Sequence, residues 1–507
     1  MFMAAQDVRR IDVYDAARSE LEVVIETVRR LGARSHTEIE RHIRSGVRGV
    51  GHCLFQSHLD GLFEDEKAAV PVWKRTAGTE IRVRRRGLEN GFGRLSVRRH
   101  GVRLSGERAA RFPMDAALNL PPEVYALSLR REVVEEVIGV SFDRTVERVD
   151  DTTGGHVPKR QAEQLTVRAA VDFDTFYSTR VVPDNDTLSR KALQIMSSDS
   201  TGVAMRPEAL REATRKEADV AKATAGRGDP MAPRKLRRHT KRMAVVTAVW
   251  EQERSERTAN DVIEALNRKT GTPKPHKQDK SKAPRPQNKR VSASVDKSQA
   301  QAIGEMFDEA QRRNPDGARD NVVLIDGEEH QKELIQNEAH ARKLDVTIVL
   351  DIIHVIHYLW LIAVVICRKD ETLSEEWVAH TLMQLLTSDP MHVVGTIRQT
   401  ATKRGIQGDE RIAIDKAVQY LRRNSPFIHY ARFLALGFPI ATGVIEGTCR
   451  HLVKDRLAIT GACWGLATAE AVLKLRALRS SGDWDDYWPF HERQEQARNH
   501  PAITKVG

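Results

Sequence analysis

The stretch NVVLIDGEEHQKELIQNEAHARKLDVTIVLDIIH, residues 321–354, decides the fold class. An apolar strand ends at Asp326, a polar helix follows through the 330s, and a second apolar strand ends at Asp351. A strand, a helix and a second strand in this order are typical of a parallel β-α-β unit. The stretch therefore predicts an α/β domain in which two strands each end at an aspartate.

Three more strands are predicted upstream of this unit. They are ALQIMSSDS, whose strand the pattern ends at Asp199, KRMAVVTAVW (241–250) and KRVSASV (289–295). With a helix from Lys297 to Arg313, the order is β-β-β-α-β-α-β, in which antiparallel strands lead into parallel β-α units. This is the order of the RNase H fold, so we expect an RNase H-like mixed-sheet α/β core.

Helical spacing dominates the rest of the chain. Residues 354–436 predict an all-helical block with breaks at TSDP, KRGIQGDE and NSP, and residues 10–48 and 122–177 are also predicted to be mainly helical. The most apolar run, residues 346–367, is interpreted as a buried strand followed by a buried helix, because its acid and histidines would be costly in a bilayer. The N-terminal residues have no apolar signal core, so no export is expected.

The composition favours a polyanionic partner. The 507 residues carry a formal net charge of +11, and the pI is about 9.5. Nucleic acid is the first expectation and an anionic membrane the second, while a basic protein without such a partner remains an alternative. The four scattered cysteines form no CxxC pair, so neither a disulfide framework nor a cysteine zinc site is expected.

Two basic elements suit contact with phosphates. The segment at 81–104, IRVRRRGLENGFGRLSVRRHGVRL, predicts a hairpin whose arginines, among them Arg84 and Arg86, contact phosphates or guard an exposed edge. SFDRTVERVDDTTGGHVPKRQAEQL predicts two helices around a glycine turn, and the second begins with Lys159 and Arg160. This outline is typical of a helix-turn-helix that binds the major groove, although any two short helices can imitate it. A Lys- and Pro-rich insert, residues 268–290, predicts a surface loop.

Three carboxylates are candidates for one metal site. Asp199 and Asp326 end predicted strands. Glu446 lies between Gly443 and Gly447 in TGVIEGTCRHLVKDR (442–456), although a glutamate on an ordinary solvated helix face needs no glycine neighbours. The predicted fold brings this late helix beside the first and fourth strands, so the acids would repel one another unless cations neutralise them. Oxygen ligands favour Mg²⁺ or Mn²⁺, and two ions about 4 Å apart suit in-line phosphoryl transfer. Each aspartate could instead be a turn residue or a helix cap.

Other polar residues are expected around this site. The basic residues Arg450, Lys454 and Arg456 follow Glu446 at roughly helical spacing and would face the same phosphates. Asp351 and His354, in DIIH, have two open interpretations. They form a helix cap with a buried histidine, or they lie at the rim of the metal site and orient water or DNA.

Most of the chain resembles bacterial insertion-sequence transposases with a DDE active site, of the ISKra type, which is related to the ISL group. The resemblance runs from about residue 113 to 490 and rests on PMDAALNLPPEVYALSLRR, SFDRTVERV, VPKRQAEQL, AAVDFDTFY, VVLIDGEEHQ, VTIVLDIIHVIHYLW, ATGVIEGTCRHLVKDR and ALRSSGDWDDYW. It implies an RNase H-like core interrupted by a helical insertion, and it puts the three acids of the family on Asp199, Asp326 and Glu446. The Asp-x-x-His element of the family falls on Asp351 and His354, without an assigned role.

Two segments depart from this family. Relatives commonly read Asp-Gly-Lys-Gly at the first acid, whereas Asp199 is followed here by Ser200 and Thr201 in DSTGV. Some relatives carry cysteines before PMDAALNL, but this chain reads HGVRLSGERAARF there, so no zinc is expected. An inactive copy that still binds DNA therefore remains an alternative.

The sequence predicts five regions: an N-terminal helix and basic hairpin region (1–112), a helix-turn-helix-like region (113–180), an RNase H-like catalytic core (190–353 and 437–480), a helical insertion (354–436) and a C-terminal tail (481–507). We expect a DNA transposase that binds terminal inverted repeats and catalyses strand cleavage and strand transfer with two Mg²⁺ or Mn²⁺ ions. Its expected partners are double-stranded DNA and further copies of the chain, in a homodimer or higher oligomer, without a membrane. Its expected location is the cytoplasm, in association with the nucleoid. A non-enzymatic DNA-binding protein and a metal-dependent nuclease of the same fold are the alternatives.

Overall fold

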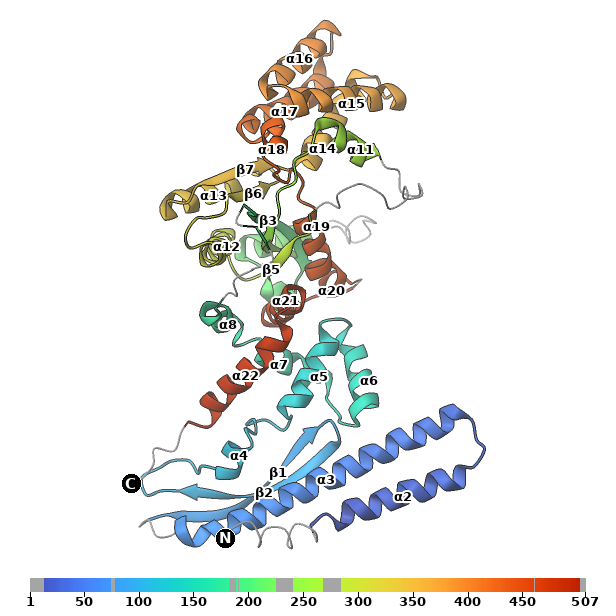
Figure 1. The fold of residues 1–507 in the computed structure, drawn as a ribbon, viewed down its shortest axis with the longest axis vertical. Helices are drawn as coiled ribbons and strands as arrows, with labels where there is room; N and C mark the ends of the chain where they lie inside the picture. Colours follow the sequence, from blue (N-terminus) through green and yellow to red (C-terminus); the bar gives the residue numbers. More distant parts are fainter. Residues whose placement is uncertain are drawn as a thin grey trace. The chain divides into compact units, whose positions relative to one another are not determined.

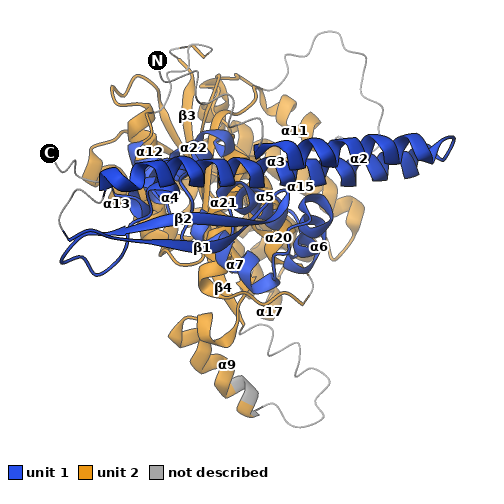
Figure 2. Ribbon diagram, turned by 90° about the horizontal axis from the view of Figure 1, so that it is seen from below, with its two compact units in different colours: residues 1–179, 483–507 blue, residues 180–482 orange. Residues whose placement is uncertain are grey.

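The chain forms two compact units (Figure 2). Unit 1 comprises residues 1–179 and 483–507, and unit 2 comprises residues 180–482. The computed structural model describes residues 13–73, 78–181, 188–189, 191–224, 240–267, 284–459 and 461–501. The larger part of the predicted Lys- and Pro-rich insert, residues 268–283, lies outside the described residues.

The described part of unit 1 begins with two helices and a hairpin (Figure 1). These elements are α2 (Asp15–Leu31), α3 (His36–Trp73), β1 (Glu80–Asn90) and β2 (Gly93–Arg103). The helix predicted over residues 10–48 is two helices, because Gly32, at φ 54°, ends α2. The predicted hairpin is confirmed, with Leu88 opposite Leu95. Both leucines pack with Leu59 of α3 in one core cluster, so one face of the hairpin covers this helix.

Short helices complete unit 1. They are α4 (Pro113–Ala117), α5 (Leu127–Val137), α6 (Phe142–Thr153), α7 (Lys159–Ala169), α8 (Phe173–Thr179) and α22 (Trp484–Asn499). The two helices predicted around a glycine turn are α6 and α7. The hydroxyl of Ser141 caps α6 by accepting from the Arg144 amide (3.3 Å), and Gly154 ends it in the left-handed region. The aromatic segment predicted as a tail is helix α22, in which Tyr487 meets Phe176 edge-on.

Unit 2 contains a mixed five-stranded sheet. Its strands are β3 (Leu193–Ala204), β4 (Lys241–Gln252), β5 (Gln287–Ser294), β6 (Asn321–Ile325) and β7 (Val346–Leu350). The order across the sheet is β5-β4-β3-β6-β7. Pairing is antiparallel from β5 to β3 and parallel from β3 to β7. The predicted α/β class and all five predicted strands are therefore confirmed.

Helices cover both faces of this sheet (Figure 1). The helices that lie between these strands in the sequence are η1 (Pro207–Ala209), α9 (Glu212–Thr224), α11 (Ala259–Asn267), α12 (Gln299–Arg313) and α13 (Glu329–Arg342). Gln194 and Asp199 lie five positions apart in β3, so their side chains point to opposite faces. The Gln194 amide donates to a backbone carbonyl of α12 (2.8 Å), whereas Asp199 contacts the segment after α19. Because both faces are covered, β6 is buried along its whole length.

The remaining elements of unit 2 are helical. They are α14 (Ile352–Ile366), α15 (Glu371–Thr387), α16 (Pro390–Lys403), α17 (Gly408–Arg423), η2 (Ser425–Phe427), α18 (Tyr430–Ala435), α19 (Gly443–Thr448), the π-helix η3 (Cys449–Lys454), α20 (Asp455–Leu457) and α21 (Leu466–Ser481). The predicted breaks at TSDP, KRGIQGDE and NSP are confirmed, because they mark the junctions α15 to α16, α16 to α17 and α17 to α18, the last of which contains the short helix η2.

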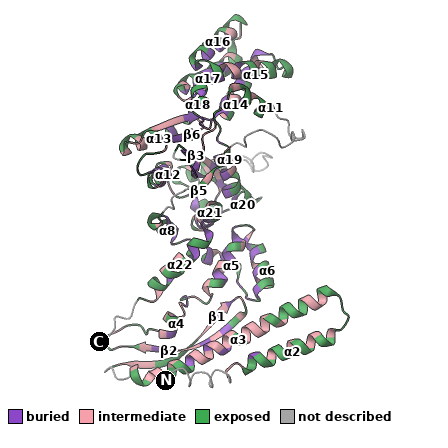
Figure 3. Ribbon diagram, viewed as in Figure 1, coloured by how far each residue is buried: buried purple, intermediate pink, exposed green. Residues whose placement is uncertain are grey.

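The apolar run at 346–367 is a strand followed by a helix, as predicted, but α14 is buried on one face only (Figure 3). Leu359 and Ile362 are fully buried, whereas Leu361 and Val364 are 49% and 41% exposed. The outer face of α14 is therefore apolar and accessible in this unit. None of the helices in the described residues combines the length and the apolar character that are needed to cross a membrane.

A buried carboxylate on α12 is surrounded by three arginines. Glu309 lies 3.1 Å from a guanidinium nitrogen of Arg290, 2.8 Å from one of Arg312 and 2.7 Å from one of Arg313. Burial acts to raise the pKa of Glu309, but Arg290 and Arg313 outweigh it and hold the pKa at about 2 instead of 4.5. The cluster ties α12 to β5, beside the sheet.

We expect Glu309→Gln to lower the free energy of unfolding by about 3 kcal/mol at neutral pH, because buried guanidinium groups lose their counter-charge. A carboxyl group whose pKa is lowered on folding stabilises the fold above its unfolded pKa and loses this effect as the pH falls. The stability of the parent protein should therefore decline between about pH 4.5 and 2. Chemical denaturation at several pH values measures this decline. The free energy of unfolding of Glu309→Gln should decrease less than that of the parent over the same pH range. The control Glu305→Gln removes an exposed carboxylate of α12 and should cost less than about 1 kcal/mol.

Candidate active site

Three aspartates lie at the carboxyl end of the parallel part of the sheet in unit 2. The parallel pairing of β3 with β6 runs as far as Ser197, opposite Leu324. The same register extended by two residues puts Asp199 opposite Asp326. Asp351 directly follows β7, the neighbour of β6 on its other side. Because these strands run in the same direction, the three carboxylates are brought to the same end of the sheet.

Asp199 lies inside β3 and not at its end, so the predicted strand end is wrong. After Ser197 the strand loses β6 as a partner, but it remains paired to β4 as far as Ala204. Oδ1 of Asp199 accepts from the Ser200 amide (2.6 Å), and Oδ2 accepts from the Cys449 thiol (3.2 Å). Burial and the charge of Asp199 raise the pKa of Cys449, so this thiol keeps its proton and orients the carboxylate.

Asp326 follows β6, as predicted, and its side chain is half-buried. Its Oδ1 accepts a hydrogen bond from the Glu328 amide (2.9 Å). Burial raises the pKa of Asp326, and the charges of Asp199 and Glu328 act in the same direction. The amide of Glu328 and the imidazole of His354 oppose this shift. The raised pKa therefore reflects the burial of this carboxylate first and the like charges near it second.

The turn after Asp326 is held by the helical block. The backbone carbonyl of Asp326 accepts from the Tyr420 hydroxyl of α17 (2.6 Å). Gly327 has φ 91°, and a Cβ there would lie 2.6 Å from the same hydroxyl oxygen. Only glycine fits this close approach and this backbone conformation. The helices after β7 thus position the second acid.

Asp351 is fully buried and caps α14, which confirms the cap interpretation of this residue. Its Oδ1 accepts from the amides of Ile353 (3.1 Å) and Thr442 (3.2 Å). Its Oδ2 accepts from the Thr442 hydroxyl (2.7 Å) and lies 2.9 Å from Nδ1 of His354. His354 itself is not buried, because 40% of its side chain is exposed. The histidine therefore belongs to the wall of the site and not to the core.

Glu446 lies in α19 with an exposed side chain. One of its carboxylate oxygens, one of Asp351 and a ring nitrogen of His354 lie within 4.8 Å of one another. Among the described residues the three predicted acids do not form such a close group. Asp326 is nevertheless coupled to this site. The hydrogen bond to Asp351 raises the pKa of His354, and the charges of Asp351, Asp326 and Glu446 add to this shift against the effect of burial.

A pocket of about 560 Å³ lies between Asp199, His354 and Glu446. It is lined by Asp199, His354, Glu446, Cys449, Arg450, Lys454 and Asp455. Arg450 and Lys454 are exposed, and their contact with phosphates stays a prediction. A Cβ at Gly443 or Gly447 would meet no atom within 4 Å, so the helix beside Glu446 has open space next to its backbone. The π-helix that follows is a type of distortion that occurs frequently at functional sites.

The expectation for Arg456 has to be corrected. Its side chain is buried, and its guanidinium carbon lies 4.7 Å from the ring centre of Trp464. Burial and the like charge of Arg476 lower the pKa of Arg456 to about 10. Arg456 is a packed residue, and it is not among those that line the pocket.

The basic residues predicted to bind DNA in unit 1 differ in exposure. Arg84, Lys159 and Arg160 are exposed. Arg86 is half-buried and donates to the Pro121 carbonyl (2.9 Å), because its face of β1 passes into the core at Leu88. Arg86 is therefore a less accessible candidate than Arg84. The contact of all four with DNA stays a prediction.

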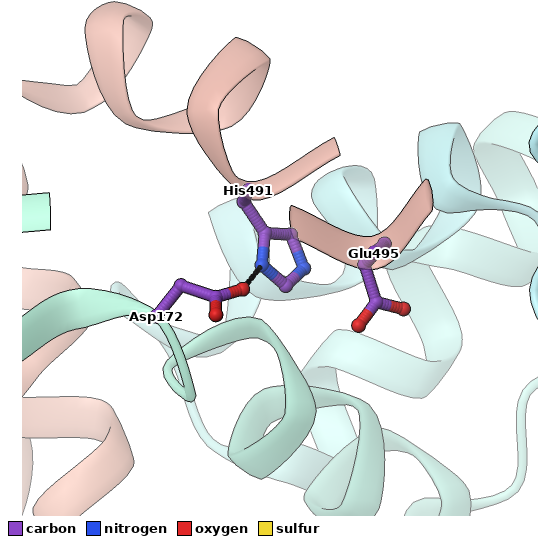
Figure 4. A group of neighbouring side chains, drawn as sticks. All are labelled: Asp172, His491 and Glu495. Carbon is purple, nitrogen blue, oxygen red and sulfur yellow. Dashed lines mark hydrogen bonds and ion pairs between the residues drawn. The ribbon is translucent and has the colours of Figure 1, made fainter. Parts of the chain in front are cut away.

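A second group of possible ligands is buried in unit 1 (Figure 4). It consists of Asp172, His491 and Glu495. Nδ1 of His491 lies 2.7 Å from Asp172, while the buried Arg130 guanidinium lies 2.9 Å from Nε2 and 3.0 Å from Glu495. A guanidinium stays protonated, so Arg130 donates to the nitrogen that a metal ion would need. The group is therefore an ionic network and not a metal site.

Comparison with known proteins identifies no family for this chain. No protein-family model matches the chain, and a search of curated proteins finds no match. The function is therefore inferred from the site itself.

Two residues of the site were missed in the sequence. Thr442 binds Asp351, which is 91 positions away, and nothing local indicates this contact. Cys449 follows Glu446 by three positions, a spacing that puts both on one side of a helix. That spacing was a usable signal for the thiol beside the acids.

Proposed function

We propose that this protein is a DNA transposase of the DDE class, which cuts DNA at the ends of an insertion sequence and joins the cut ends to a target. The proposal rests on one observation. Acidic side chains from distant segments lie near one another at the carboxyl end of the parallel strands, beside the exposed side chains of Arg450 and Lys454. Asp199 and Asp326 come from adjacent strands, and Glu446 comes from a helix that shares a pocket with Asp199. The strand order β5-β4-β3-β6-β7 supports an RNase H-like core.

The donor set suits hard divalent cations. Carboxylate oxygens prefer Mg²⁺ or Mn²⁺, and a bound cation would stabilise the charged form of Asp326, whose pKa is raised by burial and by the charges of Asp199 and Glu328. Asp199, Asp326 and Glu446 would hold two ions, and each ion needs only some of their oxygens, so the acids need not form one close group. When bound, such ions polarise the phosphate and stabilise charge on the attacking and leaving oxygens.

The other side chains of the pocket would bind and orient the DNA. Arg450 and Lys454 would contact phosphates beside the cut strand. The open backbone at Gly443 and Gly447 gives room for the sugar-phosphate chain. The Cys449 thiol holds the first acid in one orientation.

Recognition of the element ends is assigned to unit 1. Its exposed Arg84, Lys159 and Arg160 and the basic net charge of the chain support this assignment. A transposase must bring two DNA ends together, so we expect a dimer or a larger assembly.

The direct test uses a labelled duplex that contains the inverted repeats flanking the reading frame. With Mg²⁺, the protein should cut the strand at the repeat end, leave a 3′-hydroxyl and join it to a target plasmid. Cutting without joining would assign the protein to the nucleases. Binding of the ends without Mg²⁺-dependent cutting would make it a non-enzymatic DNA-binding protein. Either outcome contradicts the proposal.

The glycine after Glu446 offers a separate prediction. We expect Gly447→Ala to stabilise unit 2 by up to about 1 kcal/mol, because alanine is the better helix former and its Cβ meets no protein atom within 4 Å. The same variant should cut DNA about 10- to 100-fold more slowly, since the methyl group displaces the strand that approaches the helix. Thermal unfolding and the rate of duplex cleavage measure the two effects.

The matched control is Gly395→Ala in α16, where a Cβ also meets no atom within 4 Å. It should show a similar gain in stability with no change in cleavage. If Gly447→Ala cuts DNA at the parental rate, DNA does not approach α19 closely.

A further inference from the structure

We propose that His354 is a nitrogen ligand of the ion held beside Glu446, and that the buried pair Asp351 and Thr442 fixes its ring for this role. The inference rests on the proposed metal site. It goes beyond that site, because the three-carboxylate set contains oxygen ligands alone.

The hydrogen bonds of Asp351 decide which ring nitrogen of His354 can bind an ion. Two backbone amides, one hydroxyl and Nδ1 of His354 surround the two carboxylate oxygens. An ionised carboxylate only accepts hydrogen bonds, so Nδ1 carries the proton. The lone pair of the ring is then on Nε2. A histidine that binds a metal almost always donates its other N–H in this way.

Asp351 cannot itself be the ligand. It is fully buried, and all four of its acceptor positions are used by the protein. Within the described residues, no protein group is hydrogen-bonded to Nε2 of His354. The imidazole and Glu446 are therefore the members of the close group that remain free to bind an ion.

One carboxylate also sets the separation of the two ligands. Asp351 caps the helix that carries His354, and it accepts from both the amide and the hydroxyl of Thr442. Thr442 immediately precedes α19, the helix that carries Glu446. The N-termini of α14 and α19 are thus joined through the same buried group, so neither helix N-terminus can shift relative to the other without breaking these bonds. Such support from residues behind the ligands is what a metal site requires.

The buried histidine-aspartate pair in unit 1 differs from the pair at His354 in what its second ring nitrogen contacts. His491 also pairs with a buried aspartate, but its Nε2 faces the fixed cation of Arg130. His354 instead lines a pocket of about 560 Å³ whose lining also includes the carboxylates of Asp199, Glu446 and Asp455. A nitrogen ligand among oxygens should shift the preference of this ion from Mg²⁺ toward Mn²⁺.

The experiment is pulsed electron paramagnetic resonance of the full-length protein loaded with Mn²⁺ alone. The parent should show modulation from a directly coordinated ¹⁴N nucleus. His354→Gln should keep the fold, abolish this modulation and weaken Mn²⁺ binding at least about tenfold. Thr442→Val should keep the modulation and weaken binding about tenfold, because the ring loses part of its support. The control His357→Gln, an exposed residue one turn along α14, should change neither quantity.

The outcomes separate this inference from the proposed function. Bound Mn²⁺ without ¹⁴N modulation would overturn the role of His354 and leave the carboxylate site intact. Modulation that persists in His354→Gln would overturn it as well. No binding of Mn²⁺ by the parent protein would overturn the proposed metal site together with the inference.

Discussion

Replacing Asp326 with asparagine is expected to lower Mg²⁺-dependent DNA cleavage by about 10³-fold or more, because an ion that stabilises several kcal/mol of transition-state charge loses a ligand. The fold should survive. Burial and the neighbouring Asp199 raise the pKa of Asp326, so its charged form opposes folding when no metal is present. In metal-free buffer the variant should therefore have an equal or greater free energy of unfolding at neutral pH.

The pH dependence gives a second check on this carboxylate. An acid whose pKa is raised on folding stabilises the protein as the pH falls and the group takes up its proton. The stability advantage of Asp326→Asn over the parent should thus shrink toward low pH in metal-free buffer. Glu328→Gln removes an exposed carboxylate two residues away and should keep the cleavage activity. Cleavage at the parental rate by Asp326→Asn would mean that this acid holds no essential ion.

Replacing Arg130 with methionine is expected to lower the free energy of unfolding of unit 1 by about 3–5 kcal/mol. Arg130 is fully buried and forms ion pairs with Glu123 and Glu495, and it also donates to His491. Methionine fills much of the same space but leaves both carboxylates with less compensating charge. Arg168 and Arg498 still contact them, so the network should weaken and not vanish.

The neighbouring residue supplies the control for this substitution. Arg131→Met removes an ion pair with Asp485, an acid whose side chain is 87% exposed, and should cost less than about 1 kcal/mol. Chemical denaturation measures both variants, and hydrogen exchange should show faster opening of α22 in Arg130→Met alone. Equal stabilities of the two variants would show that the network contributes no net stabilisation.

The strands were predictable because the sheet is covered on both faces. β6 is apolar after Asn321, and the inner part of β3 is apolar except for Gln194, which is close to the pattern of a strand that is buried on both sides. The same pattern led to a wrong prediction of where β3 ends, at Asp199 instead of Ala204. Polar residues begin at Ser197, but hydrogen bonds to β4 keep the chain extended as far as Ala204. Apolar character reports burial, whereas the length of a strand depends on its partner.

The acids of the candidate site could be selected from the sequence, but their surroundings could not. Glu446 was conspicuous between glycines, and Asp326 ended a clear strand. The basic spacing predicted phosphate contacts for both Lys454, which is exposed, and Arg456, which is buried against Trp464. The sequence does not tell whether an arginine or lysine side chain is exposed to solvent or packs on an aromatic ring, because its aliphatic part can be buried in either case. The bonds from Thr442 to Asp351 likewise exist only after folding.

The interleaving of the two units along the chain has a consequence during synthesis. Residues 1–179 emerge from the ribosome first, but unit 1 is complete only when residues 483–507 have followed unit 2. At about 5–20 residues per second, translation of the intervening segment takes on the order of 15–60 s. During that delay Arg130 has neither His491 nor Glu495 as a partner. A nascent or prematurely terminated chain therefore lacks α22, and the Arg130 guanidinium of its N-terminal region stays without two of its partners.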